Sequence, residues 1–348
     1  MRLKTRKMSK YSFMYDYAEG AHPDILKALA QNNLTQQLGY GYDDYWLEAV
    51  DIIKDKFDMP DADIYFVSGG TQANLTIISS ALRSFESVIA AETGHIVAHE
   101  TGAIEYTGHK INTIKTSDGK LTPDLIKPVL TEHCDEHMVL PKLVYISNSS
   151  EFGTIYTKDD LKKLSDFCKE NDLLLFMDGA RLGASLMSKY QDLQPQDIKK
   201  YVDVFYIGGT KNGALLGEVI VLLNDKLKDK FRFSMKQKGA LLAKGRIFGT
   251  QFSTLFKDGL YYELAGYANK MAEKMANGIR NSGFDFVVTP QTNIVLPVLP
   301  DKLIAKLESK FMFHPWQKYD ENNTALRLVT SWATKEDKID EFLKMLKE

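Results

Sequence analysis

Between residues 63 and 223, short runs of β-branched and aromatic residues alternate with stretches of helical periodicity. This alternation is typical of a mostly parallel sheet that is covered by helices on both faces. The sequence predicts seven strands, at residues 63–67, 87–91, 111–115, 142–147, 173–178, 203–207 and 218–223. The predicted fold class is therefore α/β, with a large domain in which a seven-stranded, mostly parallel sheet lies between helices.

Helices are predicted between these strands and on either side of the sheet region. Helix-spaced apolar residues mark helices at residues 71–85, 158–170, 25–36 and 45–57. A long helical stretch from about residue 252 to 281 leads into a smaller α+β unit. In that unit we expect strands near 284–288, 293–296 and 325–330, a helix before the last strand and an amphipathic helix after it.

Composition and charge exclude several classes of protein. The 348 residues include 44 lysines and arginines against 46 acidic residues, a formal net charge of −2 without a long basic block. This argues against nucleic acid or an anionic membrane as the main partner. The longest apolar runs, 173–177 and 219–223, are far shorter than the roughly 18 residues of a membrane span.

The amino terminus and the cysteines bear on the compartment. Residues 1–15 are basic but lack the apolar segment of a secretory signal, so we expect a solvated arm. The two cysteines, Cys134 and Cys168, are too few for a disulfide framework and have no CxxC partner for zinc. A reducing cytoplasm is the expected location.

Three predicted strands end in unusual residues, and the carboxyl ends of the strands are where an open parallel sheet gathers its functional groups. The first motif begins Ser68-Gly69-Gly70-Thr71 and opens a helix. Its glycines let the backbone approach an anion, and the free N–H groups of the helix start can bind that anion. The alternative is a glycine turn in which Thr71 only caps the helix.

The other two motifs supply a carboxylate and an amine. Asp178 ends a hydrophobic strand, where it needs a cation or a protonated ring nitrogen, and the alternative is an ion pair with Arg181. Lys211 lies among small residues, where a desolvated lysine can form a Schiff base, and the alternative is an exposed loop lysine. An anion cradle, a pyridinium partner and an imine-forming lysine are what pyridoxal 5′-phosphate (PLP) requires.

The chain resembles the low-specificity threonine aldolases in seven segments, SGGTQANL, AETGHIVAHETGA, ISNSSEFGT, DGARLG, GGTKNGA, MKQKGALLA and ALRLVT. These enzymes belong to the fold-type-I, aspartate aminotransferase-like PLP enzymes, in the group that includes β-eliminating lyases. The resemblance runs from about residue 15 to 332. It implies PLP as the cofactor and retro-aldol cleavage of a β-hydroxy-α-amino acid, of the threonine or allo-threonine type, to glycine and an aldehyde.

The resemblance also implies roles for residues that would hold the cofactor. Lys211 corresponds to the Schiff-base lysine and Asp178 to the partner of the pyridinium nitrogen. His95 corresponds to the histidine stacked over the cofactor ring, although a lone histidine before a strand is more often structural. The phosphate cradle corresponds to Gly69, Gly70 and Thr71. Lys236 stands where the family has a phosphate-binding arginine.

Further residues are implied at the substrate. Arg181 and Arg327 correspond to the arginines that hold the amino-acid carboxylate. Arg181 is also expected to contact the cofactor. Asp16 lies in an N-terminal segment that reaches the substrate site in the family, here between Tyr15 and Tyr17 where a serine or threonine is expected.

The family's second active-site histidine is absent from the segment SNSSEFGT. Ser150 or Glu151 stands in its place, according to the register of the loop. A carboxylate there could accept a hydroxyl proton, so we predict Glu151 as a catalytic residue together with Lys211 and His95. The remaining histidines show no metal-ligand spacing, and we predict no catalytic metal.

The resemblance divides the chain into three parts and implies a homo-oligomer. Residues 1–45 are expected to form an arm and helix on the active site and a neighbouring subunit, 46–250 the large PLP-binding domain, and 251–348 a linking helix and small domain. The segment GYGYDDY at 39–45 reaches the neighbouring subunit's site in the family. A homodimer or homotetramer with shared active sites is therefore expected, with a small amino acid as the substrate.

Three rival functions stay open at this point. The nearest keeps PLP but performs β-elimination, racemisation or transamination instead of aldol cleavage. The second is an α/β protein that binds a phosphate or nucleotide without PLP. The third is a catalytically silent paralogue that acts as a binding module, against which the lysine, the aspartate and both arginines argue.

Overall fold

One large sheet holds all seven predicted strands, which confirms the α/β fold class. The computed structural model describes residues 10–347 and gives the strands as β2 (Asp63–Val67), β3 (Glu86–Ala91), β4 (Ile111–Ile114), β5 (Leu140–Ser147), β6 (Leu174–Asp178), β7 (Val204–Gly208) and β8 (Glu218–Leu222). Their order across the sheet is β2-β8-β7-β6-β5-β3-β4. Only β8 runs antiparallel to its neighbours, β2 and β7, in this sheet of described residues.

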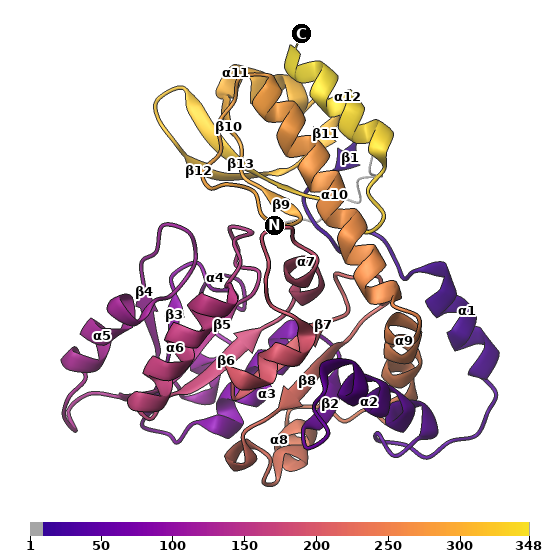
Figure 1. Ribbon diagram of the computed structural model, residues 1–348, viewed down its shortest axis with the longest axis vertical. Coiled ribbons are helices and arrows are strands. Elements are labelled where there is room, and N and C mark those ends of the chain that lie inside the picture. The colour runs from indigo at the N-terminus through magenta and orange to yellow at the C-terminus, as the bar shows by residue number, and fades with distance from the viewer. Residues whose placement is uncertain (1–9, 348) are drawn as a thin grey trace.

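Helices cover both faces of this sheet (Figure 1). They are α1 (Pro23–Asn32), α2 (Asp44–Phe57), α3 (Gly70–Ala81), α4 (His95–Ala98), α5 (Pro123–Glu132), α6 (Lys158–Glu170), α7 (Leu182–Leu186), α8 (Phe231–Gln237) and α9 (Arg246–Lys257). Helix α3 ends four residues before the predicted end at 85, because Leu82 adopts an extended conformation that leads into β3.

The alternation of side chains along the strands produces two cores. Leu175 and Met177 of β6 join the core formed with α2, α6 and α9 on one face, whereas Phe176 joins the core formed with α3 and α8 on the other. A strand buried on both faces must be apolar throughout. Each fully buried large side chain contributes about 1.5–3 kcal/mol, so the two cores hold the strand ends in fixed positions.

The long predicted helix is two helices, and the prediction of a single helical stretch is wrong at that point. Helix α9 ends at Lys257, and α10 (Leu260–Asn281) begins after a turn at Asp258-Gly259. Gly259 has a φ of +82°, in the left-handed region that favours glycine. The chain therefore changes direction, and α10 crosses from the large sheet to the smaller one (Figure 1).

The smaller sheet consists of β9 (Ile294–Val295), β10 (Val298–Pro300), β12 (His314–Lys318) and β13 (Asn323–Val329), with α11 (Asp301–Leu307) and α12 (Glu336–Lys347) beside it. The strand predicted near 284–288 is wrong, since only Phe286 makes a bridge, to Pro297. The Val287 N–H donates to the Leu296 carbonyl and the Val298 N–H to the Asp285 carbonyl, both at 2.9 Å, but the pairing does not extend beyond this one bridge. Strand β12 is largely exposed and lacks an apolar pattern, so the sequence does not predict it.

The N-terminal segment connects the two sheets. Tyr11–Ser12 form strand β1, parallel to β11 (Phe311–Met312), and the backbone of Phe13 continues the contact to Val329 with a hydrogen bond of 2.8 Å. The segment then reaches the large sheet, where the His22 N–H donates to the Gly213 carbonyl at 2.8 Å. Residues 1–9 of the predicted solvated arm lie outside the described residues. For residues 10–15 the prediction of a solvated arm is wrong, because Phe13 is fully buried in the core of the smaller unit. No helix within residues 10–347 is long and apolar enough to cross a membrane.

Candidate active site

The carboxyl ends of three adjacent parallel strands bring the predicted motifs to one edge of the sheet. Glu151 follows β5, Asp178 ends β6, and Lys211 follows β7. Ser147 and Asp178 are paired in the register of β5 and β6. This edge therefore collects two buried carboxylates and an amine from segments far apart in the sequence.

The first turn of α3 offers an anion cradle beside these strands. Its N-cap is Gly69, which has no side chain to bind the free N–H groups of the helix start, so Thr71 lies in the first turn and is not the cap. A Cβ at Gly69 would have no heavy atom within 4 Å, whereas one at Gly70 would lie 3.0 Å from the Tyr206 hydroxyl. The uncapped N–H groups and the positive end of the helix dipole suit a phosphate.

Asp178 is buried and held as an acceptor. Its Oδ1 accepts from the Ala180 N–H at 2.9 Å, and its Oδ2 accepts from the Tyr145 hydroxyl and, at 3.5 Å, from the Asn74 amide. The ion pair with Arg181, which the sequence left open, is not formed within residues 10–347, because Arg181 pairs with Asp16 and Glu151. A buried carboxylate in this setting suits a protonated ring nitrogen.

Lys211 is partly buried in a short loop whose backbone is fixed from two sides. The Gly209 N–H donates to the Gly217 carbonyl at 3.1 Å, and the Asn212 side chain donates to the Tyr261 carbonyl at 2.7 Å. Burial and the nearby Arg181 charge lower the pKa of Lys211, although acidic neighbours oppose the shift. A lowered pKa increases the fraction of neutral amine, which is the form that attacks a carbonyl.

His95 begins α4, and its Nδ1 lies 2.7 Å from Oε1 of the buried Glu100 carboxylate. Burial lowers the pKa of His95, but the hydrogen bond to Glu100 and the charge of Asp178 outweigh it, and the pKa is raised above its ordinary value. A raised pKa makes the neutral imidazole a stronger base, which suits it to accept a proton.

The two arginines differ in what they already hold. Arg181 forms a bidentate pair with Asp16, with distances of 2.7 Å from Nε and 3.1 Å from Nη2, and Asn293 donates to the same carboxylate at 3.0 Å. Burial alone would raise the pKa of Asp16, but Arg181 and Lys211 lower it to about 2. Arg181 therefore has its guanidinium fork occupied by a residue of this chain.

Arg327, on β13, has a hydrogen-bond donor without a partner among the described residues. Its Nη2 lies 3.3 Å from Glu151 Oε2, while its buried Nε has no hydrogen-bond partner. Burial and the proximity of Arg181 lower the pKa of Arg327. A buried guanidinium with an unsatisfied N–H favours a carboxylate ligand, because leaving such a donor unpaired is costly.

The two candidate residues of the loop after β5, Ser150 and Glu151, have different partners. The Ser150 hydroxyl lies 2.6 Å from the Thr154 hydroxyl and is used inside the loop, whereas the Glu151 carboxylate faces Arg327 and lies 3.9 Å from Arg181. Burial would raise the pKa of Glu151, but both arginines together with Lys211 lower it to about 2. Glu151 is thus the residue of this loop that faces the other charged groups.

Lys236 lies on α8 and is exposed, with its Nζ 4.4 Å from the ring centroid of Tyr40. Helix α8 packs on α3, and the Gln72 side chain donates to the Lys238 carbonyl at 3.2 Å. The structure thus places the end of α8 near the first turn of α3, but the described contact of the Lys236 ammonium is with an aromatic ring.

Glu218 is a buried carboxylate that sequence reasoning missed. Because β8 is antiparallel, its first residue lies at the same edge as the ends of β2 and β7, paired with Val67 and Gly208. Its Oε2 accepts from the Gly209 N–H at 2.8 Å, two residues before Lys211. Burial raises the pKa of Glu218 to about 7, against the opposing effect of the hydrogen bonds from Thr210 and Gly209.

Replacing this carboxyl is expected to change how stability depends on pH. The folded pKa of about 7 exceeds the unfolded value of 4.5, so the folded protein binds more protons and loses stability as pH rises through this interval. Glu218→Gln should remove about 2–3 kcal/mol of this loss between pH 5 and 8. Urea unfolding of the parent and the variant at pH 5 and at pH 8 measures this change in the free energy of unfolding. The exposed Glu132→Gln is the control, and an unchanged pH dependence in Glu218→Gln would contradict the assignment.

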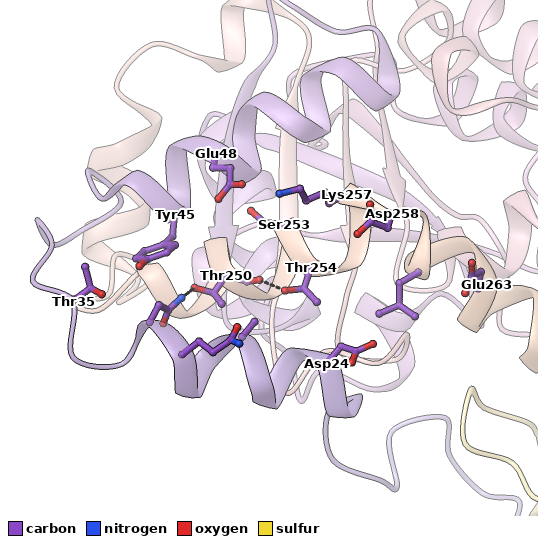
Figure 2. Close-up of a pocket in the computed structure, with 14 residues that line it drawn as sticks. Asp24, Thr35, Tyr45, Glu48, Thr250, Ser253, Thr254, Lys257, Asp258 and Glu263 are labelled. Atoms are coloured by element: carbon purple, nitrogen blue, oxygen red, sulfur yellow. Dashed lines mark hydrogen bonds between the residues drawn. The ribbon is translucent and has the colours of Figure 1, made fainter.

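A separate surface cavity of about 730 Å³ lies between α1, α2 and α9 (Figure 2). Figure 2 shows acidic side chains around it. The Asn32 side chain donates a hydrogen bond of 2.7 Å to the Thr250 hydroxyl. The cavity combines Asp24, Glu48, Asp258 and Glu263 with Lys257 and contains neither Asp178 nor Lys211. The cavity therefore lacks the combination of groups that the strand ends provide.

Known proteins are similar to this chain in both sequence and fold. The model of the β-eliminating lyase family matches residues 18–301. The low specificity L-threonine aldolase of Pseudomonas sp. (strain NCIMB 10558) is 32% identical over 94% of this chain and 95% of its own. The structure of Leishmania major threonine aldolase is 46% identical, with a TM-score of 0.95 over 97% of this chain and 98% of that one.

A protein of much lower sequence identity has the same fold. The aspartate aminotransferase of Thermus thermophilus is 14% identical, with a TM-score of 0.74 over 97% of this chain and 91% of its own. The family match, by contrast, extends over most of the sequence and includes the strand ends that carry the three motifs. The chain belongs to the β-eliminating lyase family.

Proposed function

We propose that the chain is a PLP-dependent aldehyde-lyase that cleaves a β-hydroxy-α-amino acid of the threonine type to glycine and an aldehyde. The observation that carries the proposal is the meeting of Lys211, Asp178 and the uncapped start of α3 at one sheet edge, with the unsatisfied Arg327 beside them. Names of relatives that are threonine aldolases support the choice of reaction.

The residues fit PLP in chemical terms. The α3 start would bind the phosphate, Lys211 would bind the aldehyde carbon, and Asp178 would pair with the ring nitrogen. PLP supplies an electron sink for the electrons of the bond that breaks. His95 would lie against the ring, as the resemblance implies.

The substrate carboxylate binds Arg327 in this proposal. Arg181 is kept in place by Asp16 and acts mainly through its positive charge. Fixing the carboxylate orients the amino acid so that the bond between its α- and β-carbons can break. His95 accepts the β-hydroxyl proton as the aldehyde carbonyl forms, because its raised pKa makes it a better base than Glu151, whose pKa is about 2.

A spectrum and a substrate panel test the proposal. The purified protein with PLP should absorb near the visible edge, and threonine, allo-threonine and phenylserine should release glycine and an aldehyde. Pyruvate from serine or cysteine would instead favour the rival β-elimination. A protein that stays colourless with added PLP would favour a phosphate-binding protein without pyridoxal chemistry.

Glu151 pairs with one donor of Arg327, Nη2, and so competes with the substrate carboxylate for that guanidinium, which leads to a prediction. In Glu151→Gln the charge that competes for Arg327 is lost, so KM is expected to fall about threefold or more, while kcat stays within about threefold. Steady-state kinetics with threonine separate the two constants. Ser150→Ala, in the same loop, is the control. A loss of kcat of about 100-fold at constant KM would show that Glu151 is the base.

We also propose a homo-oligomer located in the cytoplasm. The segment at residues 34–47 exposes apolar and aromatic side chains, which are Leu34, Leu38, Tyr40, Tyr42 and Leu47. Exposed apolar groups gathered in one segment are typical of an interface. Light scattering of the purified protein would measure the subunit number, and a monomer would overturn this part of the proposal.

A further inference from the structure

Glu100 is a buried carboxylate next to the proposed site, and nothing in the proposed reaction yet uses it. It follows α4 and is 6% exposed. Its Oε1 lies 2.7 Å from His95 Nδ1 and accepts from the Asn74 amide at 2.8 Å. Two side chains from different helices thus meet on one oxygen atom.

This contact determines which nitrogen of His95 carries the proton. A carboxylate only accepts hydrogen bonds, so the Nδ1 of His95 is the donor to Glu100. The other nitrogen, Nε2, is then the free acceptor of the neutral ring and points its lone pair away from Glu100. A ring fixed in this tautomer can take a proton from a substrate hydroxyl at Nε2.

The contact also links His95 to the partner of the ring nitrogen. The Asn74 amide that donates to Glu100 lies 3.5 Å from Asp178 Oδ2, and the remaining atoms Asn74 Oδ1 and Glu100 Oε2 are buried without partners. Carboxylate, amide and carboxylate therefore form a chain from His95 to Asp178. Unpaired buried acceptors are costly, which indicates that the arrangement is kept for more than stability.

We propose that Glu100 is a positioning residue that holds the His95 imidazole in the Nδ1–H tautomer and in one orientation over the cofactor. The proposal rests on the function proposed above. Glu100 touches neither substrate nor cofactor in this scheme and acts through His95. Removing its charge should leave the cofactor on Lys211 while it impairs proton transfer.

Other charged groups face His95 and act on its titration as well. Asp178 and Glu151 raise the pKa of His95, whereas Lys211 lowers it, and the ring of His99 lies 5.5 Å away between centroids. These groups remain in a Glu100 variant, so any change in titration between the variant and the parent reports on Glu100. Burial lowers the pKa of His99 and of His314, which gives two internal references.

Nitrogen and proton NMR of the histidine rings tests the proposal directly, in the protein with and without PLP. In the parent, His95 should be the Nδ1–H tautomer and should titrate at a higher pH than His99 and His314. In Glu100→Gln its midpoint should fall by about one pH unit or more, because burial is no longer opposed by a charge. A parent His95 in the Nε2–H tautomer would overturn the proposal without need of any variant.

Kinetics distinguish positioning from a structural role. Glu100→Gln should lower kcat on the order of tenfold to 100-fold and keep the PLP absorbance, and the same change in a His95→Gln background should have almost no further effect. The exposed Glu105→Gln, in the turn that follows, is the matched control. Equal losses in both backgrounds, or a lower melting temperature with an unchanged His95 titration, would show that Glu100 only supports the fold. Loss of PLP absorbance in the parent would instead contradict the proposed function.

Discussion

Lys211→Ala is expected to abolish turnover and to remove the absorbance of bound PLP near the visible edge. The side chain is an amine that follows β7, at the edge where Asp178 and the start of α3 meet, and its pKa is lowered by burial and by Arg181. Alanine supplies no nitrogen to bond the cofactor, so the loss should be complete within the sensitivity of the assay. Absorbance spectra and glycine release from threonine measure the two effects.

The control for this change is Lys302→Ala, which removes an exposed lysine of α11. It should keep both the absorbance and the turnover of the parent. The melting temperature of each variant shows whether the fold is retained. A Lys211→Ala protein that still releases glycine at the parental rate would refute the assignment of the lysine.

Arg327→Leu should reduce kcat/KM on the order of 1,000-fold, the second largest effect. The substitution removes the donors that are proposed to bind the substrate carboxylate, and it leaves the Glu151 carboxylate without its 3.3 Å partner. Removing one member of a buried charge pair typically costs 2–5 kcal/mol, which is roughly 30-fold to several-thousand-fold in a rate or binding constant. Steady-state kinetics with threonine give the number.

The lysine variant tests the geometry of the same contact. Arg327→Lys keeps the charge but loses the fork, and it should recover only part of the lost kcat/KM. Arg181 offers the comparison within the site: because Asp16 already holds its fork, Arg181→Lys should act mainly by freeing Asp16. If Arg327→Leu left kcat/KM unchanged, the carboxylate would have to bind elsewhere.

The strands and the three motifs could be predicted because their signals are local. Each strand is a short apolar run, and Asp178 and Lys211 stand directly after such runs. The break at Gly259 was also readable in principle, since a glycine after a polar residue is a common helix end. The apolar spacing continues on both sides of it, however, and therefore predicts one continuous helix.

The missed groups depend on contacts that distant segments make. Glu218 lies at the site only because β8 runs antiparallel between two parallel neighbours, which the sequence of β8 does not encode. Glu100 becomes a partner of His95 through a single helical turn together with a residue of α3. The pairing of Arg181 with Asp16 joins segments 165 positions apart, and it occupies the fork that the family resemblance assigned to substrate.

The pairing of the N-terminal segment constrains when this segment can fold during synthesis of the chain. A nascent protein leaves the ribosome from its amino end, and its early segments can fold before the later ones exist. Tyr11 and Ser12, however, pair with Phe311 and Met312, and Asp16 follows them directly toward Arg181. Residues 11 and 12 must therefore wait until residues 311 and 312 have been synthesised. In a nascent chain that ends before β11, Asp16 is not anchored from this side, so the proposed site is assembled only after β11 has been made.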